Sequence, residues 1–155
     1  MVSTLSRAAA SLATTAVVLA LAPAAVADDV YHSEHMPLTP VGSAPLRAGF
    51  VENIHADGPR VYAQEVYVLN GALPDADFEV HLLAYPFDPA CAGTAVDFGF
   101  TTLTTNGVGN GRAKRVIRPA DVPAELRGAT HGVRWEVRAG GVTVYATACT
   151  AVTLD

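Results

Sequence analysis

The chain has 155 residues, a length typical of one globular domain. Half of the residues are hydrophobic, which excludes an intrinsically disordered chain. Ten Lys and Arg residues against 15 Asp and Glu residues give a formal net charge of −5, and Lys114 is the single lysine. Such a chain lacks the basic face that a general nucleic-acid-binding protein needs to neutralise phosphates.

Residues 1–27 have the pattern of a secretory signal peptide. An arginine near the start precedes an apolar run over residues 8–22, and the small-x-small sequence of residues 25–27 predicts cleavage before Asp28. The alternative, a retained membrane anchor, would need about 20 strongly apolar residues. We therefore expect a secreted, extracellular protein with no membrane span once the signal is removed.

The two cysteines, Cys91 and Cys149, are separated by 58 residues. They are too few for a disulfide-dense scaffold, and they lack the four-ligand pattern of a structural zinc site. Because an exported protein folds in an oxidising compartment, we expect them to form one disulfide. Two free buried thiols are the alternative.

Residues 28–45 contain three prolines and little periodicity, so we expect an extended N-terminal arm before a β-domain over residues 46–155. In that domain, runs with strand character alternate with turn signals about every ten residues. The seven predicted strands span residues 46–56, 60–69, 77–85, 95–103, 112–118, 132–138 and 142–154. Residues 119–126 have room for at most one helical turn, because Pro123 opposes a longer helix.

Most of these runs alternate between apolar and polar residues with a period of two, which is typical of antiparallel strands with one solvated face. The alternation predicts four sets of core residues: Phe78, Val80, Leu82 and Ala84; Val96, Phe98 and Phe100; Val133, Trp135 and Val137; and Val142, Val144, Ala146 and Ala148. Residues 60–69 alternate poorly, so we expect a bulge there or a strand that is covered on both faces. The fold class is therefore all-β, an antiparallel sandwich or barrel of about seven to eight strands.

A set of short motifs resembles the copper/zinc superoxide dismutase family. Residues 71–81 read Gly-Ala-Leu-Pro-Asp-Ala-Asp-Phe-Glu-Val-His, and in that family a glycine-leucine turn leads into a strand reading Gly-Phe-His-Val-His. The family has a cysteine about ten residues later that bridges to the last strand, and here Cys91 and Cys149 hold these positions. The glycine-rich residues 106–111 are similar to a hairpin of the family. The resemblance covers residues 58–152 and implies a flattened Greek-key barrel.

The copper and zinc ligands of the family are mostly absent. The positions of two copper histidines fall on Glu79 and His81, and only His81 matches. The zinc loop after Cys91 is missing, and residues 136–138, where the last copper histidine is expected, contain none. Copper redox chemistry needs several imidazoles in fixed positions. The resemblance therefore predicts a retained scaffold without cofactor or dismutase activity, which serves as an extracellular binding or structural module. The sequence does not identify its extracellular ligand or protein partner.

A residual copper or zinc site is the alternative hypothesis. Glu79 and His81 share the face of one strand opposite Phe78 and Val80, and His131 or His55 could supply a third ligand. The simpler interpretation is that Glu79 and His81 are ordinary solvent-facing residues of a strand. The arm carries His32 and His35, which could complete such a site, or which belong to a polar tail.

Arg112, Lys114, Arg115 and Arg118 form the one basic cluster, a candidate anion-binding surface. On a strand, Arg112 and Lys114 point the same way and Arg115 points the opposite way. The simpler interpretation is a solvated edge strand protected by charge. Nucleophilic catalysis has no support, because no Gly-x-Ser-x-Gly, phosphate-loop or dinucleotide motif occurs. An enzyme is therefore the less favoured class.

Overall fold

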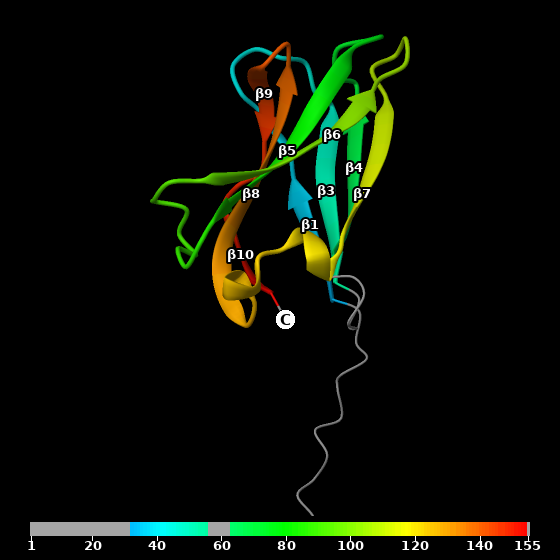
Figure 1. Cartoon of the computed structure of the whole chain (residues 1–155). Helices are drawn as coiled ribbons and strands as arrows, with labels where there is room; N and C mark the ends of the chain where they lie inside the picture. The colour runs from blue at the N-terminus through cyan, green and yellow to red at the C-terminus, as the bar shows by residue number, and fades with distance from the viewer. Residues whose placement is uncertain (1–31, 56–62, 155) are drawn as a thin grey trace, which may run out of the picture.

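The computed structural model describes residues 32–55 and 63–154, and within them the chain forms antiparallel strands with only two short 3₁₀ turns (Figure 1). The predicted signal peptide lies outside the described residues. The 3₁₀ turns are η1 (Pro119–Asp121) and η2 (Ala124–Leu126). The strands are β1 (His32–Pro37), β2 (Thr39–Pro40), β3 (Ala48–His55), β4 (Ala63–Asn70), β5 (Asp77–Tyr85), β6 (Val96–Thr104), β7 (Gly111–Ile117), β8 (Ala129–Ala139), β9 (Val142–Ala146) and β10 (Thr150–Leu154).

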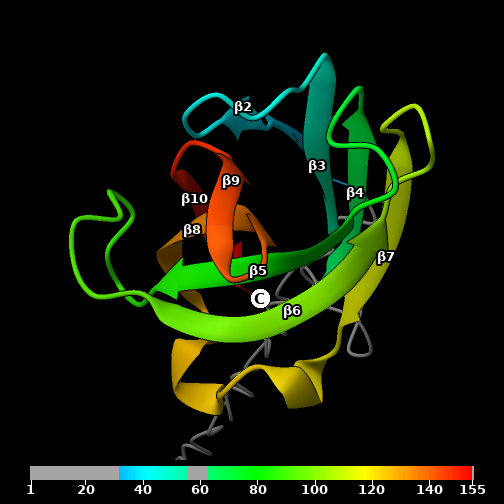
Figure 2. The same cartoon turned by 90° about the horizontal axis from the view of Figure 1, so that it is seen from above.

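The strands form two sheets that face each other across the core (Figure 2). Sheet A has the order β1-β3-β4-β7, and sheet B has the order β2-β9-β8-β5-β6, with β10 paired to the first half of β8. The predicted fold class, an all-β antiparallel sandwich, is confirmed. Among the described residues, no helix is long and apolar enough to cross a membrane.

The connections between the sheets follow a Greek-key order. Strand β7 returns to lie beside β4 in sheet A, and β8 returns to lie beside β5 in sheet B. Strands β6 and β7 are neighbours at the junction of the two sheets (Figure 2). There the Arg115 guanidinium of β7 donates hydrogen bonds to the Phe98 and Gly99 carbonyls of β6, which helps to close the sandwich.

The described part of the expected N-terminal arm belongs to the sandwich. Strand β1 pairs with β3 along its whole length, and β2 pairs with β9. Met36 and Leu38 are 5% exposed and pack in the core. Of the three prolines that suggested an arm, Pro37 and Pro40 end the edge strands β1 and β2, and Pro45 lies in the loop before β3, so no ladder hydrogen bond is lost.

The period-two alternation correctly predicted the core faces of β5 and β8. Phe78 and Val80 of β5 are at most 1% exposed, and Trp135 and Val137 of β8 have the same low exposure. Each such side chain stabilises the fold by about 1.5–3 kcal/mol through its burial. Strand β4 is covered on both faces in its middle, as expected, with Tyr67 inside and Val66 buried on the outer face.

The predicted core faces of β6 and β9 were partly wrong. On β6, Phe98 packs against the core, but Val96 and Phe100 are 47% and 53% exposed. Phe100 lies outside because of a bulge, since two residues of β6 lie opposite one residue of β5 between His81 and Leu83 and the alternation changes phase there. Val96, in phase with Phe98, is exposed at the start of the strand. On β9, Tyr145 is buried opposite Val137 of β8, a register shift follows, and Val142 next to the β8–β9 turn is 67% exposed.

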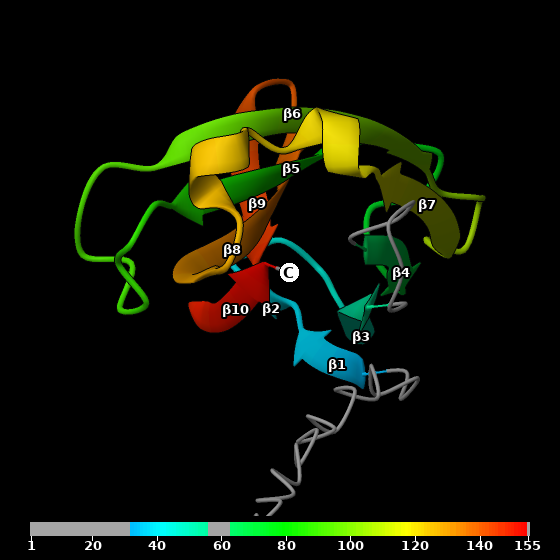
Figure 3. The ribbon, with the colours of Figure 1, turned by 60° about the horizontal axis from the view of Figure 1, so that its bottom comes forward.

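One disulfide joins Cys91 and Cys149, as predicted, with their Cα atoms 6.0 Å apart. It ties the loop between β5 and β6 to the segment between β9 and β10. Gly132 of β8 lies beneath this loop, where a Cβ atom would stand 2.4 Å from the Asp88 carbonyl oxygen. The turns η1 and η2 lie across one end of the sandwich, next to the end of β10 (Figure 3).

Candidate functional site

Glu79 and His81 lie on the outer face of sheet B, as the alternation of β5 predicted. The Glu79 side chain is 45% exposed, whereas His81 is only 7% exposed. His81 lies opposite Phe100 of β6 in the ladder, and the centroids of the two rings are 5.2 Å apart. Phe100 therefore helps to shield the imidazole from solvent.

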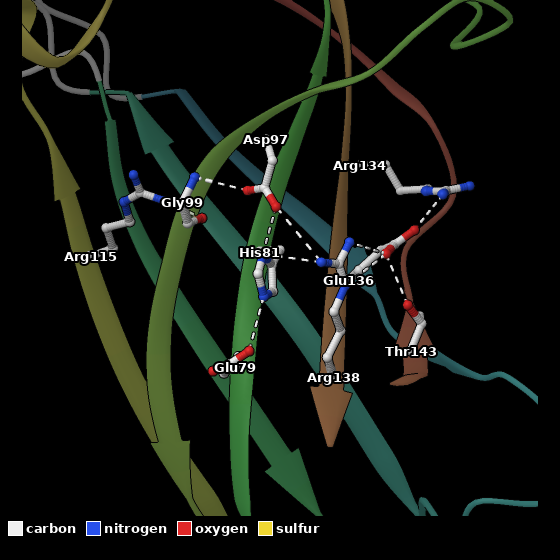
Figure 4. Close-up of polar contacts among 9 residues, drawn as sticks. All are labelled: Glu79, His81, Asp97, Gly99, Arg115, Arg134, Glu136, Arg138 and Thr143. Carbon is white, nitrogen blue, oxygen red and sulfur yellow. Dashed lines mark hydrogen bonds and ion pairs between the residues drawn. The ribbon is translucent and has the colours of Figure 1, made fainter. Parts of the chain in front are cut away.

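Both ring nitrogens of His81 contact carboxylates (Figure 4). Nδ1 lies 2.8 Å from Asp97 Oδ2, and Nε2 lies 3.3 Å from Glu79 Oε2. Nδ1 also lies 3.4 Å from an Arg138 guanidinium nitrogen, so three side chains surround the two ring nitrogens. Both ring nitrogens of His81 are therefore engaged by side chains of the fold.

Arg138 of β8 joins this group to a second one around Glu136 (Figure 4). Its guanidinium contacts Glu136 Oε2 at 2.8 Å and lies 3.7 Å from Asp97 Oδ2. Arg134 donates to the other Glu136 oxygen, and the Thr143 hydroxyl of β9 donates to Oε2 at 2.9 Å. We call these residues the ionic network: Glu79, His81, Asp97, Arg134, Glu136, Arg138 and Thr143.

The ionic network favours the charged form of two of its carboxylates, Glu136 and Asp97. Burial raises the pKa of Glu136, but the hydrogen bonds from Arg138, Thr143 and Arg134 outweigh burial and bring the pKa below 4.5. Burial of Asp97 is likewise outweighed, mainly by the hydrogen bond from His81, so its pKa lies below 3.8. A pKa that is lower in the folded state gives stability at pH values above the unfolded-state pKa, and that stability is lost as the pH falls.

Replacing Arg138 with methionine is expected to lower the free energy of unfolding by about 2 kcal/mol near neutral pH, between the values for exposed and for buried ion pairs. The difference between variant and wild type should shrink as the pH falls below 4.5 and through the lowered pKa of Glu136, because the charge that Arg138 stabilises is then lost in the folded wild type as well. Urea unfolding at neutral and at acidic pH measures both effects. The control is Arg112→Met on the exposed face of β7, and an equal Arg138→Met loss at both pH values would contradict the account.

His131 lies on the opposite face of β8 from the ionic network and is 2% exposed. Its Nε2 lies 2.7 Å from the Leu126 carbonyl oxygen, and its Nδ1 accepts a hydrogen bond from the Phe87 backbone N–H at 3.0 Å. These partners fix the neutral tautomer with hydrogen on Nε2. Both nitrogens of His131 are therefore used within the fold.

The structure does not bring the three predicted metal ligands together. His131 stands five residues before Glu136, the ladder partner of His81, which corresponds to about 17 Å along the strand. No group of three or more His, Cys, Asp or Glu side chains that could hold a metal ion occurs within residues 32–55 and 63–154. The residues at the positions implied by the resemblance do not fit copper or zinc.

His32 and His35, the two histidines of the expected N-terminal arm, do not lie beside His81 in the sheet pairing, because both belong to β1 of sheet A. His35 Nδ1 lies 2.9 Å from Glu52 Oε2, and Ser33 donates to the same carboxylate. These two hydrogen bonds lower the pKa of Glu52. His32 and His55 are opposite each other in the β1–β3 ladder, but their side chains lie outside the described part of the chain.

The basic cluster is divided between two faces of β7. Arg112 and Lys114 are exposed on the outer face, and Arg118 is exposed beyond the end of the strand. Arg115 points to the opposite face, as the alternation predicted. Its guanidinium donates hydrogen bonds to two backbone carbonyls of β6. The four residues therefore do not form one anion-binding surface, and β7 is an edge strand of sheet A.

Comparison with protein-family models, with curated proteins and with solved structures gives no match for this chain.

Asp97 and Arg138 were missed as members of the site. The alternation of β8 already placed Arg134, Glu136 and Arg138 outward on one face, and this was the available signal. Asp97 comes within reach of His81 through the register of β6 on β5, in which Asp97 lies opposite Leu83 across the bulge. The pairing register that joins the three strands is not visible in any one of them.

A hollow of about 330 Å³ opens beside the ionic network. This volume is within the usual range for small-molecule sites, which is about 300–1,000 Å³. Its lining combines two carboxylates, a hydroxyl, a guanidinium and the β8–β9 turn: Asp77, Phe78, Glu79, Thr102, Arg138, Gly140 and Gly141. The outer face of sheet B thus combines a rigid polar surface with an open polar hollow.

Proposed function

We propose that this chain is a secreted, non-catalytic module that keeps the scaffold of the copper/zinc superoxide dismutases and acts extracellularly by binding or as a structural unit. Three features support the proposal: the motifs in residues 71–81, the Cys91–Cys149 bridge and the two-sheet sandwich. That architecture is shared by the dismutases and by many cell-surface domains. The signal-like residues 1–27 support export.

The observation that carries the proposal is the use of the imidazole nitrogens within the fold. His81 contacts Asp97 and Glu79, and His131 contacts two backbone groups. A copper centre that cycles between oxidation states needs several histidine ligands with free lone pairs and orienting partners. In this chain, carboxylates and backbone groups of the fold occupy the positions next to the ring nitrogens that a metal ion would need.

The ionic network gives the outer face of sheet B a fixed arrangement of charges. Three carboxylates and two guanidinium groups are joined across β5, β6 and β8 by direct contacts. Side chains that are held in this way lose little conformational entropy when a ligand binds. A pre-ordered polar face next to an open hollow suits recognition rather than redox chemistry.

Metal content and dismutase activity test the proposal directly. The purified chain without residues 1–27 is incubated with excess Cu²⁺ and Zn²⁺, dialysed, and assayed for bound metal and for superoxide consumption. We expect metal well below one equivalent and no activity above that of the His81→Ala variant. Stoichiometric retained metal with dismutase activity that His81→Ala abolishes would overturn the proposal in favour of a metal protein that uses His81 and its neighbours.

A further inference from the structure

The interior of the sandwich contains two adjoining cavities of about 40 Å³ and 50 Å³. They share five apolar lining residues, which come from both sheets and the C-terminal strand: Leu82, Ile117, Val133, Val152 and Leu154. A single water molecule needs about 10–15 Å³ of such volume. Each cavity therefore has room for more than one water-sized group, and the two cavities lie side by side with these five walls in common.

The smaller cavity has a polar end formed by Asn53, Glu65 and Trp135, which are 3%, 1% and 1% exposed. The Tyr67 hydroxyl donates a hydrogen bond to the Glu65 carboxyl. The Trp135 indole N–H faces the same carboxyl and lowers its pKa, yet it makes no hydrogen bond of normal geometry. Burial outweighs these interactions and raises the pKa of Glu65. A buried N–H group without a hydrogen-bond acceptor lowers the stability of the fold by about 1–3 kcal/mol.

The larger cavity is lined almost entirely by hydrocarbon. Ala84, Phe98, Val122 and Leu126 complete its wall beyond the shared residues. His131 also lines it, but its two nitrogens are already bonded to the backbone. Water does not occupy apolar cavities of this kind readily, whereas small apolar molecules do.

We propose that the interior binds a small neutral amphiphile, with a hydrogen-bond acceptor at the Trp135 indole N–H and a short hydrocarbon tail in the larger cavity. Water in the smaller cavity would satisfy the indole but would leave the larger cavity empty. An ionised ligand would have to lose its hydration in an apolar space without a counter-charge. The proposal rests on the proposed role as a binding module and adds the chemical class of one ligand.

The single tryptophan makes the test specific, because the 15N-labelled chain gives one indole N–H signal in a two-dimensional NMR spectrum. We expect titration with 1-butanol to move this signal downfield and to saturate, at alcohol concentrations that leave the far-UV circular dichroism unchanged. In the series ethanol, 1-propanol, 1-butanol, the affinity should rise about fourfold for each added methylene.

A pair of variants separates the cavity from general solvent effects. Ala84→Leu adds bulk to the larger cavity and should weaken 1-butanol binding by about tenfold or more, the contribution of two methylenes. Ala151→Leu, the same change at an exposed position of β10, should leave the affinity unchanged. If Ala84→Leu does not fold, the alcohol series on the wild-type chain still decides.

The proposed ligand site would be overturned by an indole signal that moves linearly without saturation, or by equal affinity for ethanol and 1-butanol. Water would then be the occupant of the smaller cavity. Neither result affects the metal measurement. Stoichiometric metal at His81 would overturn the proposed function and leave the alcohol titration standing, so the two failures are distinguishable.

Discussion

Replacing Cys91 and Cys149 with alanine is expected to lower the free energy of unfolding by about 4 kcal/mol, as an upper value. The disulfide closes a segment whose ends are 58 residues apart, and without it the unfolded chain regains the conformations that this closure removes. A loss of that size lowers the melting temperature of a domain of this length by on the order of 10 °C. Urea and thermal unfolding of the oxidised protein and of the double variant measure the loss.

A local effect adds to the chain entropy. Cys91 and Phe87, both in the loop after β5, have backbone φ angles of 53° and 58°, which are unfavourable for residues with a Cβ atom. The disulfide is one of the contacts that hold this loop. The control is dithiothreitol, which should destabilise the wild-type protein to the level of the double variant and leave the variant unchanged. Equal stability of wild type and variant would contradict the account.

Replacing His131 with leucine is expected to destabilise the protein by about 2–4 kcal/mol, because two backbone groups lose their hydrogen-bond partner at once. These groups are the Phe87 N–H and the Leu126 carbonyl, so the imidazole joins the β5–β6 loop and η2 to β8. Urea unfolding at neutral pH measures the loss.

Two further variants separate the hydrogen bonds of His131 from its volume. His131→Asn keeps an acceptor near the Nδ1 position but does not reach Leu126, so it should lose about half as much stability as His131→Leu. His35→Leu, at a side chain that is 58% exposed, should change stability by less than about 1 kcal/mol. A His131→Leu protein as stable as the wild type would show that these bonds do not hold the loop.

The core of β5 and of β8 could be predicted because a period of two is a local property of each strand. Phe78 and Trp135 illustrate this, since each is predicted inward by its neighbours alone and each is 1% exposed. The phase of β6 could not be predicted in the same way. Its bulge depends on pairing with β5, and Phe100 therefore lies outside although the alternation predicted it inside.

The candidate site shows the same limit. The sequence correctly put Glu79 and His81 on one outer face, but the partners of His81 come from β6 and β8, at positions that only the register defines. His131 is the opposite case, since it is in phase with Val133 and Trp135. That alternation, carried back by one more step, points His131 into the core, whereas the hypothesis of a residual metal site makes it a ligand beside His81.

The nitrogen resonances of the histidine side chains, followed by NMR during a titration with diamagnetic Zn²⁺, test the central claim most directly. The claim is that the fold already uses the imidazole nitrogens of His81 and His131. The account predicts that both pairs of ring signals stay at their starting positions through one equivalent of metal, with His131 remaining the tautomer protonated on Nε2. A stoichiometric shift of a His81 or His131 ring nitrogen to a metal-bound position would contradict it.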